Sequence, residues 1–324
     1  MRMTNSMLVS NYMNNMQRNL GNMSTLQNQL ATGKTIQRAS DNPYIAVRTM
    51  QLNSEIAANK QYNSNIKDTT NWLDTTDTAL GQANNIIARV KELTVKAGNG
   101  SFSGDELNAI KDEVVEKIKE LGQVLNTSFD GNYIFGGTKS TSKPIAVDDN
   151  GNISFLDKDG GPADATAMTQ LGSPLKTEIS EGVTVQYNKT AVDILNYKDS
   201  EGTASSVITT LSDLVNSLND AAGTDADAAK EALEKMSGKL TEDITAISNH
   251  ISQLRSNVGA MQNRMESAKT TNEDQNYNMT SILSSTDDID FAEKTMEYSV
   301  LQTVYIATLQ TSSKILNNTL LDYM

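Results

Sequence analysis

The C-terminal stretch from Asp287 to Met324 contains neither proline nor glycine, so one helix of about 50 Å can run through it. Ser285 or Thr286 is expected to cap this helix, and the aspartates that follow suit a helix N-terminus. Between residues 298 and 321 the only charged residue is Lys314. A helix this long and this poor in charge cannot remain unpartnered in water, and its partners are the first thing the rest of the chain must explain.

The apolar residues of this stretch fall on two opposite faces when they are placed at 100° per residue. One face holds Ile289, Ala292, Met296, Val300, Val304, Ala307 and Ile315. The opposite face holds Phe291, Tyr298, Tyr305, Leu309, Leu316, Leu320 and Tyr323. Because two apolar faces need partners on both sides, the pattern predicts packing within the chain and also against other molecules.

The N-terminal stretch, residues 4–32, offers the partner within the chain. Between residues 3 and 33 the only charged residue is Arg18. The apolar residues repeat at the spacing of a coiled-coil seam, interrupted at Gln27, and form one stripe. Its members are Val9, Met13, Met16, Leu20, Met23 and Leu30. Residues 1–50 carry five basic and one acidic residue, and residues 283–324 two basic and six acidic, so the two ends have complementary charges of +4 and −4. Their remaining surface is rich in amides and hydroxyls, which suits burial against copies of the chain.

Composition excludes several classes of function. The chain has 324 residues and a net charge of −13, which argues against nucleic acid as a partner. The lack of cysteine excludes disulfides and thiolate chemistry. No apolar run reaches the length of a membrane span, so we expect no membrane insertion. The first residues lack the pattern of a secretory signal, so we expect no cleaved signal peptide.

No group of residues has the spacing of a catalytic or metal-binding site. His250 is the only histidine, which leaves neither a metal cage nor a catalytic triad with support. The acid-rich segments at residues 148–152 and 157–161 lack the bidentate acid that closes a calcium loop, and hairpin turns explain them better. We therefore expect no enzyme, no cofactor and no metal.

The sequence of the middle of the chain predicts helical arms around a β-rich insert. Apolar repeats predict helices over about residues 44–97, 104–125, 207–222 and 226–281, the second opened by a capping box from Ser103 to Glu106. Short β-like runs occur at residues 145–147, 153–156 and 183–187. The predicted fold class is mainly α, with long antiparallel helical rods, paired N- and C-terminal coiled-coil helices and a small β-rich inserted domain. We expect five segments: an inner helix and link (1–42), a first rod (43–130), the insert (131–202), a second rod (203–284) and a C-terminal inner helix (285–324).

Several motifs resemble those of the flagellin superfamily. The link from Leu30 to Pro43 has the order Leu, Gly, basic residue, Ile and Ala-x-Asp-x-Pro of that family, with Thr32 where the family has Ser. Residues 89–100 resemble the end of the family's first rod helix. Residues 259–266, with Gly-Ala-x-Gln-Asn-Arg, and residues 288–321 resemble its C-terminal rod and inner helix. The resemblance covers about residues 1–138 and 203–324 and implies the nested helical fold and a structural role.

One further motif is similar to a single branch of the superfamily, hook-associated protein 3, which joins the hook to the filament. Its marker residues here are Tyr133, Phe135, Gly136 and Gly137. This resemblance implies a ring of copies that contacts hook-associated protein 1 on one side and flagellin on the other, outside the cell. It also implies type III export and a cytoplasmic export chaperone bound to the C-terminal helix.

The expected assembly interface combines the two apolar ends with the family motifs. Its residues are Met13, Met16, Leu20, Met23, Leu30, Arg38, Asp41, Pro43, Arg89, Asn263, Arg264, Phe291, Tyr298, Tyr305, Leu309, Leu316 and Leu320. A filament-forming flagellin is the nearest alternative. An intracellular coiled-coil scaffold, or an enzyme whose site lies in residues 139–202, are alternatives of other classes.

Overall fold

The computed structural model describes residues 5–99, 102–198, 202–223 and 225–315 of the chain. The predicted interface residues Leu316 and Leu320 lie outside these ranges. The chain divides into two compact units, residues 1–60 with 273–324, and residues 61–272. The fold is mainly helical with a small insert that contains short sheets, as the sequence predicts.

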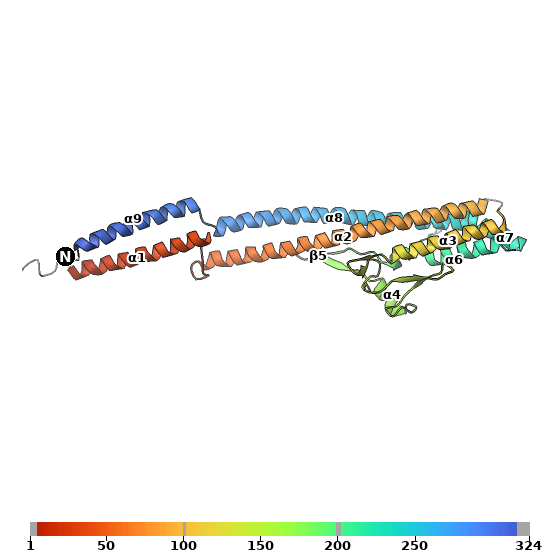
Figure 1. The fold of residues 1–324 in the computed structure, drawn as a ribbon, viewed down its shortest axis with the longest axis horizontal. Helices are drawn as coiled ribbons and strands as arrows, with labels where there is room; N and C mark the ends of the chain where they lie inside the picture. Colours follow the sequence, from red (N-terminus) through yellow and green to blue (C-terminus); the bar gives the residue numbers. More distant parts are fainter. Residues whose placement is uncertain (1–4, 100–101, 199–201, 224, 316–324) are drawn as a thin grey trace, which may run out of the picture. The chain divides into compact units, whose positions relative to one another are not determined.

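The first unit brings the two ends of the chain together. Helix α1 (Asn5–Thr32) lies beside α9 (Phe291–Ile315), as the red and blue ribbons of Figure 1 show. The unit also contains the first turns of α2 (Pro43–Asn99) and the last turns of α8 (Thr241–Asp287). The Asn59 side-chain amide donates to Gln275 Oε1 at 3.3 Å and joins these two helices. The predicted pairing of the N- and C-terminal helices is therefore confirmed.

The start of the C-terminal helix differs from the prediction. Ser285 and Thr286 do not cap it, because α8 runs through both and their hydroxyls donate to the Ile282 carbonyl at 2.9 and 2.7 Å. The cap is Asp290, whose Oδ1 accepts the backbone N–H of Ala292 at 2.8 Å. The helix is interrupted between these points because Ile289 donates its backbone N–H to the Gly33 carbonyl at 3.1 Å.

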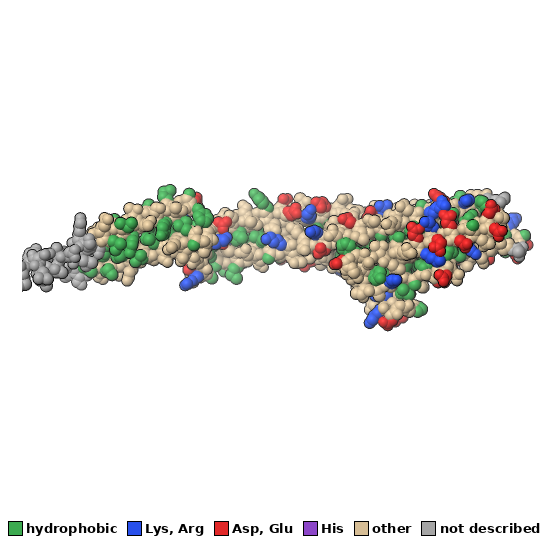
Figure 2. All heavy atoms as spheres, in the orientation of Figure 1, with side chains coloured by type: hydrophobic (Ala, Val, Ile, Leu, Met, Phe, Trp, Pro, Cys, Tyr) green, Lys and Arg blue, Asp and Glu red, His purple; other side chains and the backbone are tan. Residues whose placement is uncertain are grey.

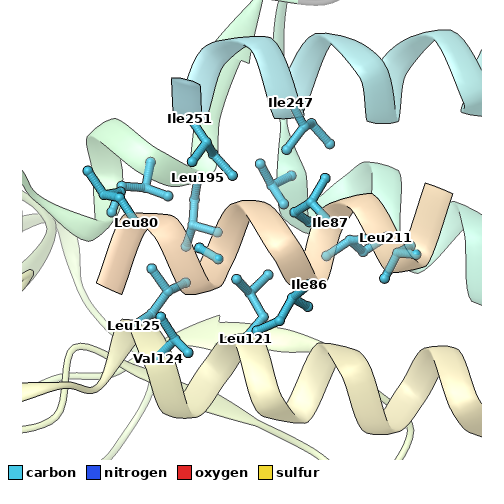
Figure 3. Close-up of a cluster of buried hydrophobic side chains, with 14 of the residues drawn as sticks. Leu80, Ile86, Ile87, Leu121, Val124, Leu125, Leu195, Leu211, Ile247 and Ile251 are labelled. Carbon is cyan, nitrogen blue, oxygen red and sulfur yellow. The ribbon is translucent and has the colours of Figure 1, made fainter. Parts of the chain in front are cut away.

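The second unit holds the hydrophobic core. It is built from α2, α3 (Gly104–Leu125), α6 (Val207–Ala221), α7 (Ala226–Lys235), the π-turn η1 (Met236–Leu240) and α8. Figure 3 shows side chains from four of these helices meeting, among them Ile87, Leu121, Leu211 and Ile247, each at most 2% exposed. Each fully buried side chain of this kind contributes about 1.5–3 kcal/mol. The capping box predicted from Ser103 to Glu106 is present.

The insert consists of antiparallel two-stranded ribbons and two short helices, α4 (Ala165–Leu171) and α5 (Ala191–Leu195). The pairs are β1 (Ser128–Phe129) with β2 (Asn132–Tyr133), β3 (Ile145–Val147) with β4 (Ile153–Phe155), β5 (Lys176–Ser180) with β6 (Val183–Gln186), and β7 (Asn196–Lys198) with β8 (Ala204–Ser206). The β-like runs of the sequence form β3, β4 and β6. The acid-rich segment at residues 148–152 is the predicted hairpin turn, in which Asp148 Oδ1 accepts the backbone N–H of Asn152 at 2.7 Å.

Three side chains of α2 and α8 attach the insert to the helices. Asn65 and Asn272 donate from their side-chain amides to consecutive carbonyls of β5, those of Glu178 at 3.0 Å and Ile179 at 2.8 Å. Trp72, the only tryptophan, packs edge-to-face on Phe129 and Tyr187. Hydrogen bonds from two helices and aromatic packing from one therefore fix the position of β5 and its neighbours.

Candidate assembly surface

The seam between α1 and α9 is a coiled coil in alternating steps of three and four residues. On α9 its half-buried members include Tyr298, Leu301 and Tyr305. Tyr12 of α1 donates its hydroxyl to the Thr308 carbonyl, and Phe291 approaches Gly33, so the two helices run antiparallel. The pairing uses one face of each helix.

The register of α1 differs from the predicted one. Val9, Met16, Met23 and Leu30 lie in the seam as expected, but the residues between them are Tyr12, Asn19 and Leu26, of which Leu26 is 8% exposed. Met13 and Leu20 are 47% and 43% exposed, one position away from the seam. The prediction that Met13 and Leu20 belong to the seam is wrong: both registers alternate steps of three and four, but the structure buries Leu26 and leaves Met13 and Leu20 exposed. No local signal separates the two registers, because Asn19 interrupts one of them as Gln27 interrupts the other.

The second face of α9 remains exposed in the single chain. Met296, Val300 and Val304 are 66%, 56% and 42% exposed. Phe291 and Leu309, assigned to the opposite face with Tyr298 and Tyr305, are also exposed, at 57% and 42%. Figure 2 shows the hydrophobic side chains gathered over α1 and α9 with few charges among them. Large exposed apolar surface on a helix pair is typical of a protein–protein interface.

The link after α1 is joined to the turn before α9 by backbone bonds and by one lysine. Thr35 donates its backbone N–H to the Asp287 carbonyl at 2.6 Å. Lys34 Nζ lies 3.3 Å from an oxygen of Asp287 and 2.7 Å from one of Asp288. The bond to Asp288 raises the pKa of Lys34, and the bond from Lys34 lowers the pKa of Asp288. Gly33 has φ +71°, a conformation that glycine adopts readily, and it lets α1 end there.

The polar residues of the link form a tight turn. Asp41 accepts the backbone N–H groups of Gln37 and Arg38 at 3.3 and 2.9 Å. Asn42 accepts the backbone N–H of Ile45 at 3.3 Å, and α2 begins at Pro43, one residue before the predicted start. Asp41 therefore shapes the link, whereas the side chain of Arg38 is exposed.

The interface residues predicted on the rods lie in the second unit. Arg89 bridges α2 and α3, because its guanidinium donates to Glu113 at 2.7 Å and to Glu92 at 3.0 Å. Asn263 and Arg264 are exposed on α8. The part of these three residues in the assembly interface stays a prediction.

The marker motif at residues 133–137 is buried in the insert and contacts several of its segments. Ile134 and Phe135 are 1% and 0% exposed, and the Phe135 carbonyl accepts the Ala191 backbone N–H at 2.8 Å. Gly137 has φ +59°, and a Cβ there would overlap the carbonyl oxygens of Leu171 and Gln170. The motif thus requires glycine at this position and joins the end of α3 to α4 and α5.

The described residues contain neither a candidate metal site nor a candidate membrane-spanning helix. Within the described ranges, no group of three or more His, Cys, Asp or Glu side chains could hold a metal ion. His250 Nε2 lies 2.8 Å from the Asp193 carbonyl and so links α8 to α5. None of the described helices combines the length and apolar character needed to cross a bilayer.

Comparison with known proteins identifies the family. The model of the bacterial flagellin N-terminal helical region matches residues 3–140, and that of the C-terminal helical region matches residues 241–324. Together they span more than half of the chain, which belongs to the bacterial flagellin family. Flagellin 1 of Proteus mirabilis is 30% identical over 148 residues, which are 45% of this chain and 40% of that protein. The chain thus spans about two fifths of that relative. A flagellin of Clostridium tyrobutyricum is 23% identical over 92% of this chain and 94% of its own length.

Two solved structures have folds similar to that of this chain. Flagellar hook associated protein-3 of Legionella pneumophila has a TM-score of 0.62 at 15% identity, covering 73% of this chain and 98% of that one. The flagellar junction protein FlgL of Legionella pneumophila has a TM-score of 0.57 at 15% identity, covering 76% of this chain and 100% of that one. This chain has the fold of those proteins.

Proposed function

We propose that this protein is a structural subunit of the bacterial flagellum that joins the hook to the filament. The observation that carries the proposal is the α1–α9 pair, whose one face holds the two helices together while Met296, Val300 and Val304 stay exposed. A surface of this kind has a physical use when it is buried against other subunits. The link after α1 also contributes, because Lys34 in this link forms ion pairs with Asp287 at the end of α8 and with Asp288 after it.

The choice of junction over filament rests on the insert. Its marker residues Tyr133, Phe135, Gly136 and Gly137 resemble those of the hook-associated branch, and the packing of Phe135 and Gly137 explains why the fold needs them. The proteins with similar folds include ones described as hook-associated and junction proteins. No catalytic role is part of the proposal.

The proposed partners follow from the position. Copies of the chain form a ring, which meets hook-associated protein 1 on the hook side and flagellin on the filament side, outside the cell. Before assembly, a cytoplasmic export chaperone covers the C-terminal helix, because its exposed apolar residues would otherwise drive aggregation. Arg38, Arg89, Asn263 and Arg264 are proposed as further interface residues.

A filament-forming flagellin is the second candidate. Its support is the flagellin of Clostridium tyrobutyricum, which aligns over nearly the full length of both chains. The two functions differ in the number of copies that each flagellum contains, because a filament needs many more subunits than a ring at its base. They also differ in what is lost when the protein is absent.

Deletion of the gene distinguishes them. If the protein is the junction, hooks remain, filaments are lost and flagellin accumulates in the medium. If the protein is the filament subunit, the major filament protein itself disappears from both the cells and the medium. Cells that keep normal filaments and motility would refute both functions.

A further inference from the structure

Two exposed patches lie on the first unit outside the α1–α9 pair. The first is on the opening turns of α2, where Tyr44, Val47 and Met50 are 80%, 56% and 69% exposed. They are spaced three apart and share one side of the helix. Leu52 and Ile56, at 1% and 8% exposed, mark the opposite side, which is buried. The three residues therefore form an outward apolar surface, called here the α2 patch.

The second patch is on the last turns of α8. Tyr277 is 77% exposed, and Glu273 and Asp274 beside it are also exposed. Asn272, 2% exposed, and the half-buried Asn276 mark the inner side of this helix. Glu273, Asp274 and Tyr277 form the α8 patch. A tyrosine this exposed combines a large contact area with a polar tip, as residues that dominate protein interfaces do.

The charges around the two patches are opposite. Arg48, next to Val47 on α2, flanks the α2 patch, whereas the α8 patch carries two carboxylates. Among the described residues, neither Arg48 nor Glu273 and Asp274 form an ion pair. Other charges of the same unit are paired, such as Lys34 with Asp288 and Lys294 with Glu297, while Arg18, Glu55 and Lys60 share the lack of an ion pair among the described residues. Arg48, Glu273 and Asp274 are distinguished by their position at the two exposed patches, where their charges complement each other in sign.

We propose that the α2 patch of one copy of the chain docks on the α8 patch of the next. The contact is head to tail, because a patch placed against its own copy would oppose two like charges at its rim. Head-to-tail contacts generate rings when their rotation closes. The inference rests on the proposed function for the ring, and it adds which two faces of the rod meet.

Cysteine cross-linking tests the contact directly, because the natural chain contains no cysteine. Val47→Cys and Tyr277→Cys are made singly, each in its own gene copy, and expressed together or alone. Flagella are isolated and treated with a short, flexible bismaleimide. The expected result is a cross-linked dimer when the two variants are present together and none with either variant alone. A chain that carries both substitutions is expected to give a ladder of oligomers.

Lys60→Cys paired with Tyr277→Cys is the matched control. Lys60 is exposed on the same helix but lies about 140° around it from Val47 at 100° per residue. Dimers from Val47→Cys alone would overturn the head-to-tail contact. Equal cross-linking by the control pair, or no dimers in flagella that contain the protein, would overturn the inference and leave the proposed function standing. Flagella without the protein would overturn both.

Charge reversal gives a second, independent readout. Arg48→Glu is expected to lower the yield of the cross-linked dimer about two- to fivefold, the effect of one exposed ion pair. Asp274→Arg on the partner copy should restore the yield. Two reversals whose effects simply add would contradict the pairing of these patches.

Discussion

Replacing Gly137 by alanine should unfold the insert far more readily than the same change at Gly131. Both glycines have positive φ, +59° and +76°, so each alanine costs about 1–2 kcal/mol of backbone strain. Around Gly131 no other atom lies within 4 Å of the added Cβ. At Gly137 the Cβ would lie 2.5 Å from the Gln170 carbonyl oxygen, which also accepts from the backbone N–H and the hydroxyl of Thr138 at 3.1 and 3.0 Å.

The difference between the two variants can be worked from these contacts. Moving the Gln170 carbonyl away sacrifices two hydrogen bonds of about 1 kcal/mol each, in addition to the strain. Gly137→Ala is therefore expected to destabilise by about 3–4 kcal/mol in total, and Gly131→Ala by about 1–2 kcal/mol. Gly131 serves as the control for the strain alone.

Urea unfolding followed by tryptophan fluorescence measures this difference locally. Trp72 is the only tryptophan and contacts Phe129 and Tyr187 of the insert, so its emission reports on their attachment. With a slope of about 2–3 kcal/mol/M, Gly137→Ala should lower the midpoint by about 1 M or more. Equal midpoints for the two variants would refute the reasoning that close packing, and not φ alone, requires glycine in the marker motif.

Three further predictions concern the attachment of the insert, the link and the seam. Asn272→Ala leaves the Ile179 carbonyl without its side-chain donor and should cost about 1–3 kcal/mol by the Trp72 assay, whereas Asn278→Ala, exposed on the same helix, should cost much less. Because its folded pKa is lowered, Asp288 stabilises the link above its unfolded pKa of about 3.9, and this contribution is lost as the pH falls through the folded value. The protection factors of the Thr35 and Ile289 amides, which correct for the pH dependence of intrinsic exchange, should fall over that acid range in the natural protein, and unchanged protection factors would exclude the Lys34 contact as a stabiliser. Leu26→Ala should weaken the α1–α9 pair by about 2–4 kcal/mol and Leu20→Ala by much less, measured by amide exchange in α9; equal effects would contradict the register.

The sequence could predict the helices because their signals are local. The glycine at the end of α1, Pro43 at the start of α2 and the capping box at Ser103 each act within a few residues. The register of α1 needed a choice between Leu26 and Leu20, and only the partner helix decides it. The cap of α9 was missed because Ile289 is held by Gly33, a contact between opposite ends of the chain.

The candidate site was predictable in kind and less so in its residues. Poverty of charge and two apolar faces indicated that α9 has partners on both sides, and its exposed Met296 and Val300 agree with that reasoning. The sequence could not tell that Phe135 and Gly137 act inside the insert, because their neighbours come from α4 and α5.

The central claim is that the outward face of α9 serves assembly and not the fold of the single chain. Val300→Asp, compared with the similarly shaped Val300→Thr, tests it in the gene-deletion strain. Val300→Asp is expected to leave the Trp72 unfolding midpoint unchanged yet to yield hooks without filaments, with flagellin in the medium, whereas Val300→Thr is expected to restore filaments. Full-length filaments on cells that carry Val300→Asp would contradict the account.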